Sequence, residues 1–132
     1  MDTSKVYFTS FKADFNENLT KKLERLIRTA GIEQIDFKDH YAAIKIHFGE
    51  YGNLAYLRPQ YAKTVGDVVK SLGGKPFLTD CNTLYVGSRK NAVDHLETAF
   101  MNGFTPYITG CQVIIADGLK GTDEALVPVK GE

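Results

Sequence analysis

Residues 58–80 read RPQYAKTVGDVVKSLGGKPFLTD, and within them a helical pattern passes directly into a strand pattern. The apolar residues of 61–72 recur at intervals of three and four, which places them along one side of a helix. Pro59 suits the first turn of that helix, and the Gly-Gly pair after it suits a left-handed helix end. The next residues, 76–79, contain the β-favouring Phe and Thr. This stretch therefore predicts one helix followed at once by one strand.

The same pattern of apolar residues along one helix side occurs at 19–30 and again at 92–103. Short β-favouring runs occur at 5–11, 42–48 and 112–116. Strands and helices thus alternate at roughly thirty to forty residues per unit, the size of a strand–crossover–strand motif. Such crossovers are right-handed and join parallel strands. The sequence predicts an α/β domain with an open, mostly parallel sheet of about four to five strands and three amphipathic crossover helices packed on its faces.

Less regular segments complete the predicted architecture. The run 113–116 is apolar on both faces, which predicts a central strand covered on both sides. Residues 54–57 are predicted to form a short hairpin arm after the strand at 42–48. Residues 120–132 are predicted to be a poorly packed tail or an edge strand, because Pro128 is tolerated only at an edge. We expect residues 1–132 to form a single domain, the N-terminal part of a longer protein.

Composition excludes several classes of function. Sixteen Lys and Arg balance sixteen Asp and Glu, so no overall charge attracts nucleic acid or an anionic membrane. The N-terminus has no apolar segment of the kind that directs secretion, and no apolar run approaches the length of a membrane span. We therefore expect a cytoplasmic protein that binds neither nucleic acid nor membrane. The sequence does not decide its oligomeric state.

Polar residues follow the predicted strands at their carboxyl ends, where ligands bind in open parallel sheets. In chain order they are Lys45, His47, Glu50, Asp80, Asn82, Thr83 and Asp117. Lys45 and His47 point to the same side of their strand, and a buried ammonium without a partner is unfavourable by several kcal/mol. They need solvent on an edge strand, a carboxylate partner or a ligand. Asp80 and Asp117 also fit a second interpretation, in which each caps a turn through backbone N–H groups.

The candidate roles follow from side-chain chemistry. Lys45 supplies charge to a ligand, His47 transfers a proton, and Asp80 is their carboxylate partner, so these three are the candidate catalytic residues. Candidate ligand-binding residues are Glu50, Asn82, Thr83 and Asp117. His47, Asp80 and Asp117 are also weak candidates for a divalent metal such as iron(II) or manganese. No metal-binding spacing motif supports that site, and the sequence leaves open whether the protein is an enzyme.

Several blocks of the chain resemble a known family. They are KIHFGE at 45–50, TDCNTLY at 79–85, Asn91-Ala92 with His95, and IIADG at 114–118. Together they resemble the family called domain of unknown function 362, whose members are uncharacterised prokaryotic proteins. Many are named iron–sulfur centre proteins because a ferredoxin-like segment with two four-iron clusters follows this domain. The resemblance implies a redox-associated protein with a C-terminal ferredoxin-like module as partner.

The cysteine content separates this chain from that module. A ferredoxin-like segment needs closely spaced cysteines, whereas this chain has only Cys81 and Cys111. We therefore expect no cluster on this chain, and 4Fe-4S clusters only in a downstream segment. Cys81 is either a half-buried thiol or a nucleophile.

Two hypotheses of function follow. In the first, the domain binds a small polar or anionic ligand, with or without a divalent metal, at the carboxyl edge of the sheet. In the second, it is a non-catalytic structural domain that docks a ferredoxin-like module. The face that carries Lys45 and His47 discriminates between them, because an open cleft favours a ligand and a sealed ion pair favours a scaffold.

Overall fold

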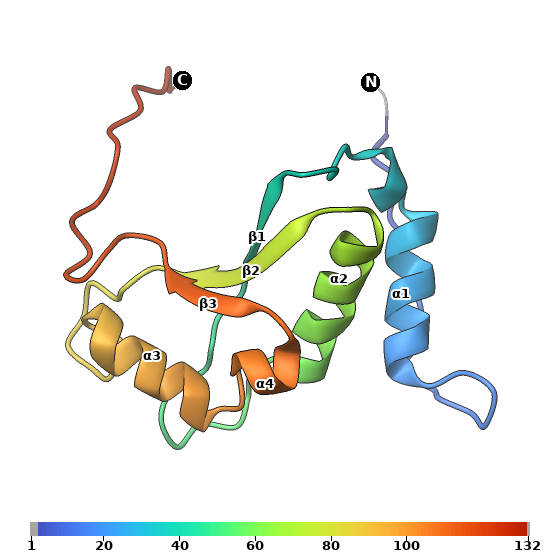
Figure 1. The fold of residues 1–132 in the computed structure, drawn as a ribbon, viewed down its shortest axis with the longest axis horizontal. Coiled ribbons are helices and arrows are strands. Elements are labelled where there is room, and N and C mark those ends of the chain that lie inside the picture. The colour runs from blue at the N-terminus through green and yellow to red at the C-terminus, as the bar shows by residue number, and fades with distance from the viewer. Residues whose placement is uncertain (1–2, 132) are drawn as a thin grey trace.

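The computed structural model describes residues 3–131, which form an α/β fold (Figure 1). Its parallel strands are β1 (Tyr41–Lys45), β2 (Lys75–Asp80) and β3 (Gln112–Ile115). Its α-helices are α1 (Leu19–Thr29), α2 (Pro59–Ser71), α3 (Ala92–Met101) and α4 (Pro106–Thr109), and a 3-10 turn η1 (Ile32–Gln34) follows α1. The helix and strand predicted within residues 58–80 are therefore confirmed as α2 and β2.

Local signals in the sequence set the ends of the helices. The side chain of Asn18 accepts a hydrogen bond from the N–H of Lys21 at the start of α1. Asn91 does the same for Val93 and Asp94 at the start of α3, so its role is that of a helix cap. Gly73 follows α2 with a φ of +82°, a left-handed conformation that glycine adopts without strain.

The sheet has the order β1-β2-β3, with β2 in the centre. The register aligns Ile44, Leu78 and Val113, one from each strand. These three belong to a core that includes Ala62 of α2 and Ala99 of α3. Since two right-handed crossovers in the same direction put both helices on one face of a sheet, α2 and α3 share the face that this core covers.

The other face of the sheet carries neither α2 nor α3, which corrects the prediction of helices on both faces. It is exposed at the edge strands, although Thr79 of the central strand β2 is only 5% exposed there. Ala43 and Lys45 of β1 are exposed, and Ile114 of β3 keeps half of its surface in contact with solvent. The prediction that 113–116 forms a central strand is also wrong, because β3 lies at an edge. Two-sided apolar character shows that a strand can be buried, but the order of the strands is set by the crossovers.

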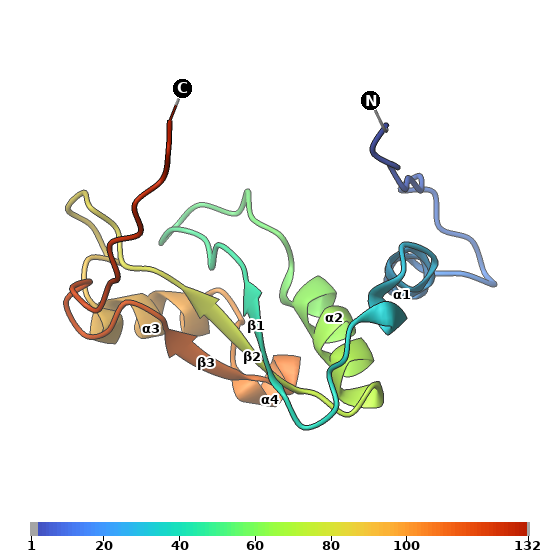
Figure 2. The same cartoon turned by 90° about the horizontal axis from the view of Figure 1, so that it is seen from above.

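The sheet has three strands within residues 3–131, fewer than the four to five predicted. Residues 5–11 and 54–57 form no strand; the first lies beside α1, and the second belongs to the loop that enters α2. Residues 122–131 form an exposed tail without a strand (Figures 1 and 2), and residue 132 lies outside the described residues. A β-favouring sequence forms a strand only where a neighbouring backbone pairs with it.

Helix α1 also differs from its prediction as a crossover helix packed on the sheet. It packs against α2, and none of its residues is buried. Without a strand formed by residues 5–11, α1 connects no pair of strands. Across the described residues, no helix is both long and apolar enough to cross a membrane.

Candidate functional site

The residues singled out from the sequence lie along the carboxyl ends of the strands and in the loops that follow them. The structure divides them into two groups. Near the ends of β1 and β2 lie Lys45, His47, Glu50 and Asp80, and near the ends of β2 and β3 lie Asn82, Thr83 and Asp117. In the first group, Lys45, Glu50 and Asp80 belong to one network of charges, and His47 stands apart from it. The second lines a pocket.

Asp80 is the centre of the charge network. Its side chain is 5% exposed, and its Oδ1 lies 2.7 Å from Nζ of Lys45 and accepts the N–H of Cys81 at 2.9 Å. Its Oδ2 lies 3.2 Å from Nη1 of Arg89. Two cations and a backbone N–H thus compensate the burial of this charge. The side chain of Lys45 is 66% exposed, so the ion pair is not sealed beneath a helix.

Arg89, which was not predicted from the sequence as a site residue, joins the network to Glu50. Its guanidinium is 4% exposed, bonds Asp80 on one side, and on the other donates from Nε to Oε1 of Glu50 at 2.9 Å. The hydroxyl of Tyr85 donates to the same oxygen of Glu50 at 2.6 Å. The bond from Arg89, followed by that from Tyr85, lowers the pKa of Glu50. Arg89 lies in a loop nine residues beyond β2, and no local pattern signals the burial of such an arginine.

His95 of α3 completes the surroundings of Asp80. Its ring is fully buried, packs edge-on against Phe48 with ring centroids 5.7 Å apart, and has Nε2 3.7 Å from Oδ2 of Asp80. Neither ring nitrogen has a hydrogen-bond partner among the described residues. Burial lowers the pKa of His95, and the nearby Asp80 opposes this only in part. The histidine is therefore neutral in the folded protein near pH 7.

We expect His95 to make the protein less stable in mild acid. Because the folded state lowers the pKa of His95 below the ordinary 6.5, protons bind the unfolded chain preferentially as the pH falls below about that value. The free energy of unfolding should therefore decrease as the pH falls from 7 towards 5. His95→Gln should reduce this slope, and His40→Gln, at an exposed site, should keep it. Urea unfolding at several pH values measures it; an equal slope in wild type and His95→Gln would contradict the account.

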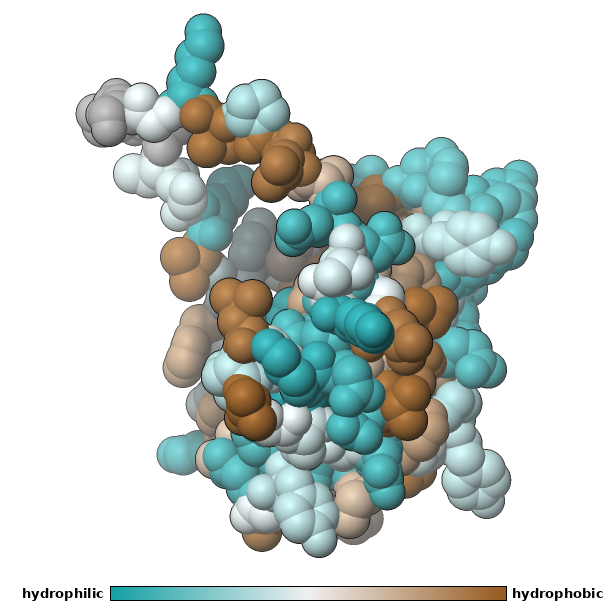
Figure 3. All heavy atoms as spheres, turned by 90° about the vertical axis from the view of Figure 1, so that its left-hand side faces the viewer, coloured by the Kyte–Doolittle hydropathy of each residue, from teal (hydrophilic) through white to brown (hydrophobic). Residues whose placement is uncertain are grey.

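The pocket between the ends of β2 and β3 has a volume of about 520 Å³. Asn82 lines it and joins the two loops. Its N–H and its side-chain amide donate to Asp117 at 2.9 and 3.1 Å, and the amide also donates to the carbonyl of Gly118 at 2.8 Å. The hydroxyl of Thr83 donates to the carbonyl of Tyr85 at 3.0 Å. Figure 3 shows this end of the molecule, where hydrophilic side chains gather in the middle and hydrophobic ones flank them.

Charged side chains surround this pocket. Lys90, Lys120, Asp123 and Glu124 line it together with the exposed Cys81. Lys90 donates to the carbonyl of Leu84 at 2.8 Å, whereas Lys120 forms no hydrogen bond or ion pair with residues 3–131. None of these four charged residues was singled out from the sequence. They follow the strand ends by several residues, and only the fold brings the two loops together.

His47 lies outside the charge network, and the predicted metal site is not formed within residues 3–131. His47 is exposed, and its Nδ1 accepts the N–H of Gly49 at 2.9 Å, which leaves the proton of the neutral ring on Nε2. The structure does not bring His47, Asp80 and Asp117 together as metal ligands, and within residues 3–131 it holds no cluster of three such groups. The oxygens of both carboxylates already accept hydrogen bonds from the protein.

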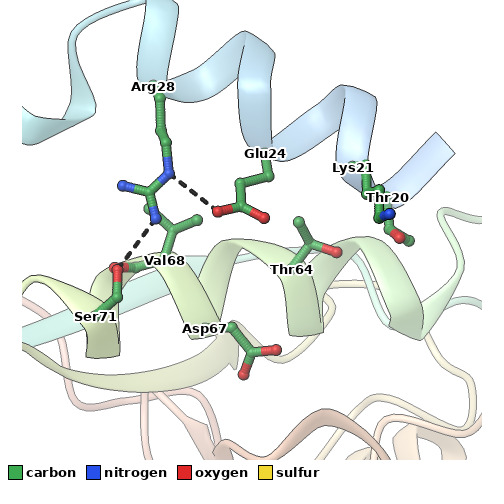
Figure 4. A pocket seen from close by; sticks show the side chains of 8 residues that line it. All are labelled: Thr20, Lys21, Glu24, Arg28, Thr64, Asp67, Val68 and Ser71. Atoms are coloured by element: carbon green, nitrogen blue, oxygen red, sulfur yellow. Dashed lines mark hydrogen bonds and ion pairs between the residues drawn. The ribbon is translucent and has the colours of Figure 1, made fainter. Parts of the chain in front are cut away.

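A second polar pocket, of about 240 Å³, lies between α1 and α2 (Figure 4). Arg28 crosses it and donates to Glu24 at 3.0 Å and to Ser71 at 3.3 Å. Lys21, Thr64 and Asp67 also line it. No residue predicted from the sequence as a site residue lies here. Substitutions in this pocket are therefore suitable controls for substitutions in the pocket at the strand ends.

The fold and this edge define a class of protein: an α/β domain with an open parallel sheet and a polar pocket at the carboxyl ends of its strands. Residues 42–132 match the family described as domain of unknown function (DUF362), and the chain belongs to that family. The matched residues include β2, β3, all of β1 except Tyr41, the helices α2 and α3, and both groups of site residues. No curated protein and no solved structure matches the chain.

Proposed function

We propose that the domain binds a small polar ligand, carrying an anionic group and at least one hydroxyl, in the pocket at the ends of β2 and β3. One observation carries the proposal: the pocket opens at the carboxyl ends of neighbouring parallel strands, where ligands bind in open α/β sheets. Lys90 and Lys120 there can donate hydrogen bonds to an anionic group, and Asp123 and Glu124 can accept a hydrogen bond from a hydroxyl.

The other site residues would position this pocket. Asn82 and Asp117 hold the two loops together, and the hydroxyl oxygen of Thr83 is able to accept a hydrogen bond from a ligand. Asp80 and Glu50 both hold Arg89, which fixes the loop between β2 and α3. In this proposal Lys45 pairs with Asp80 and so helps to hold the charge network in place. His47 remains the candidate for donating or transferring a proton at the carboxyl edge of the sheet.

The cellular setting is part of the proposal. By resemblance to redox-associated iron–sulfur centre proteins, the domain would be cytoplasmic and work beside a C-terminal ferredoxin-like module. The proposal does not include a divalent metal, because the carboxylates of Asp80 and Asp117 already accept hydrogen bonds from protein donors. A sheet of four to five strands is likewise a proposal, and residues 5–11 are the segment that would extend it.

Docking of a partner module is a second candidate function, and exposed apolar residues favour it. Leu84 and Val86 are more than nine-tenths exposed in the loop after β2, and Leu119 is exposed in the loop after β3. A contiguous apolar patch rimmed by polar residues marks a protein interaction site. If docking is the function, no small anion should stabilise the domain.

Malate should stabilise the protein against heat more than succinate. The two dianions differ by the hydroxyl of malate, which can donate a hydrogen bond to the acidic residues of the pocket. Lys120→Ala should weaken malate binding about tenfold, since hydrogen bonds to charged groups contribute about 1.5 kcal/mol. Lys21→Ala, in the pocket between α1 and α2, is the matched control and should leave binding unchanged. The measurement is Tm as a function of ligand concentration. Absence of any shift, or equal effects of the two substitutions, would overturn the proposal.

A further inference from the structure

Strand β1 has an unpaired edge. The N–H of Ile46 donates to the carbonyl of Thr79 at 3.0 Å, and the carbonyl of His40 accepts the N–H of Lys75 at 2.8 Å, so the even-numbered residues of this strand bond to β2. In a parallel pair only alternate residues bond to a given neighbour. The backbone groups of residues 41, 43 and 45 therefore point to the open side, where no described strand lies. Native proteins cover such an edge.

An apolar groove of about 410 Å³ runs beside this edge. Its lining includes Leu23 and Leu26 of α1, Ile44 and Ile46 at β1, and Tyr61 and Val65 of α2. Since no residue of α1 is buried, this groove is also where the apolar side of α1 remains uncovered. One extended segment with apolar side chains would pair with the strand edge and cover the helix together.

Residues 5–11, KVYFTSF, have the properties of that segment. They form no backbone-to-backbone hydrogen bond with the described residues, and Val6, Phe8 and Phe11 are each more than four-fifths exposed. Residues 9–11 already line the groove, and Nζ of Lys22 holds the carbonyl of Lys12 at 2.7 Å. Figure 2 shows this segment beside α1, at the end of the molecule opposite the C-terminal tail.

We infer that residues 5–11 dock in this groove and pair in parallel with the free edge of β1. The connection from residue 11 to residue 41 contains α1, and a parallel pair needs a crossover of about a dozen or more residues, normally a helix. The segment of the same chain is the occupant because it is already held at the groove. Its effective concentration there exceeds that of a second copy in dilute solution.

Hydrogen exchange of individual amides tests this inference. In the monomeric wild-type protein, alternate amides of 5–11 and the amides of residues 41, 43 and 45 should exchange at least about tenfold more slowly than in an unstructured chain. Of two adjacent N–H groups, one must face β1. One of the two variants Phe8→Pro and Thr9→Pro should therefore abolish this protection, and the other need not. Ser4→Pro, just outside the segment, should preserve it. The amides of α2 and β2 report that each variant is folded.

Three results would overturn the inference. The first is exchange of 5–11 at unstructured rates in the folded wild type. The second is retained protection of β1 in both Phe8→Pro and Thr9→Pro. The third is protection that rises with protein concentration together with a dimer in sedimentation, which would assign the groove to a second copy. None of these results bears on the ligand pocket, because that pocket lies at the ends of β2 and β3.

Discussion

Replacing Asp80 with alanine is expected to lower the free energy of unfolding by about 3–5 kcal/mol, the range for removing one partner of a buried ion pair. The substitution leaves the buried guanidinium of Arg89 with Glu50 as its single carboxylate partner. It also removes the acceptor for the N–H of Cys81 and the counter-ion of Lys45. Urea unfolding monitored by circular dichroism measures the effect.

Asp67 provides the matched control. It is an exposed aspartate of α2 that pairs with Lys63 one helical turn away at 2.7 Å. Exposed pairs of this type contribute about 0.5 kcal/mol or less, so Asp67→Ala should change stability little. If Asp80→Ala and Asp67→Ala have equal effects, the charge network does not stabilise the fold, and its proposed role in positioning the pocket is lost.

Gly49→Ala should have the second largest effect, a loss of about 2–4 kcal/mol from backbone strain and steric overlap together. Gly49 has a φ of +84°, a left-handed conformation that alanine adopts with strain. A methyl group there would lie 2.6 Å from Cδ1 of Tyr56 and 2.7 Å from Nδ2 of Asn102. The residue directly precedes Glu50, so its conformation also directs Glu50 towards Arg89.

Gly52→Ala separates the two causes. Gly52 has a nearly equal φ of +80°, but a methyl group there meets nothing within 4 Å. Its substitution should therefore report backbone strain alone, about 1 kcal/mol. Thermal or urea unfolding of the two variants gives the comparison. A loss for Gly49→Ala no greater than that for Gly52→Ala would show that the close packing around Gly49 contributes nothing.

Local sequence signals were sufficient to predict α1, α2 and α3, whereas the four-residue helix α4 was not predicted. The periodicity of 61–72 and the glycines after it depend on residues a few positions apart. The caps at Asn18 and Asn91 are equally local, but they were found only in the structure. The strand order could not be predicted in this way, because it depends on which crossovers form. For the same reason the β-favouring run 5–11 was predicted to be a strand, whereas its pairing depends on a partner backbone distant in sequence.

The candidate site likewise contains contacts that could be predicted from the sequence and residues that could not. The rule that parallel strands end at one edge brings Lys45 to Asp80 and Asn82 to Asp117, and both contacts exist in the structure. Their function in ligand binding stays a prediction. Arg89 and Lys120 could not be found, because both lie in loops whose paths depend on the whole fold.

The most direct test of a ligand pocket at the strand ends is a titration of the ¹⁵N-labelled protein with malate, followed by ¹H–¹⁵N correlation spectra. The account predicts saturable shifts in the amides of residues 82–84, 90 and 117–121, around the pocket between β2 and β3. The amides around Lys21 and Asp67, in the pocket between α1 and α2, should not move. Saturable shifts confined to that second pocket, or no saturable shift at all, would contradict it.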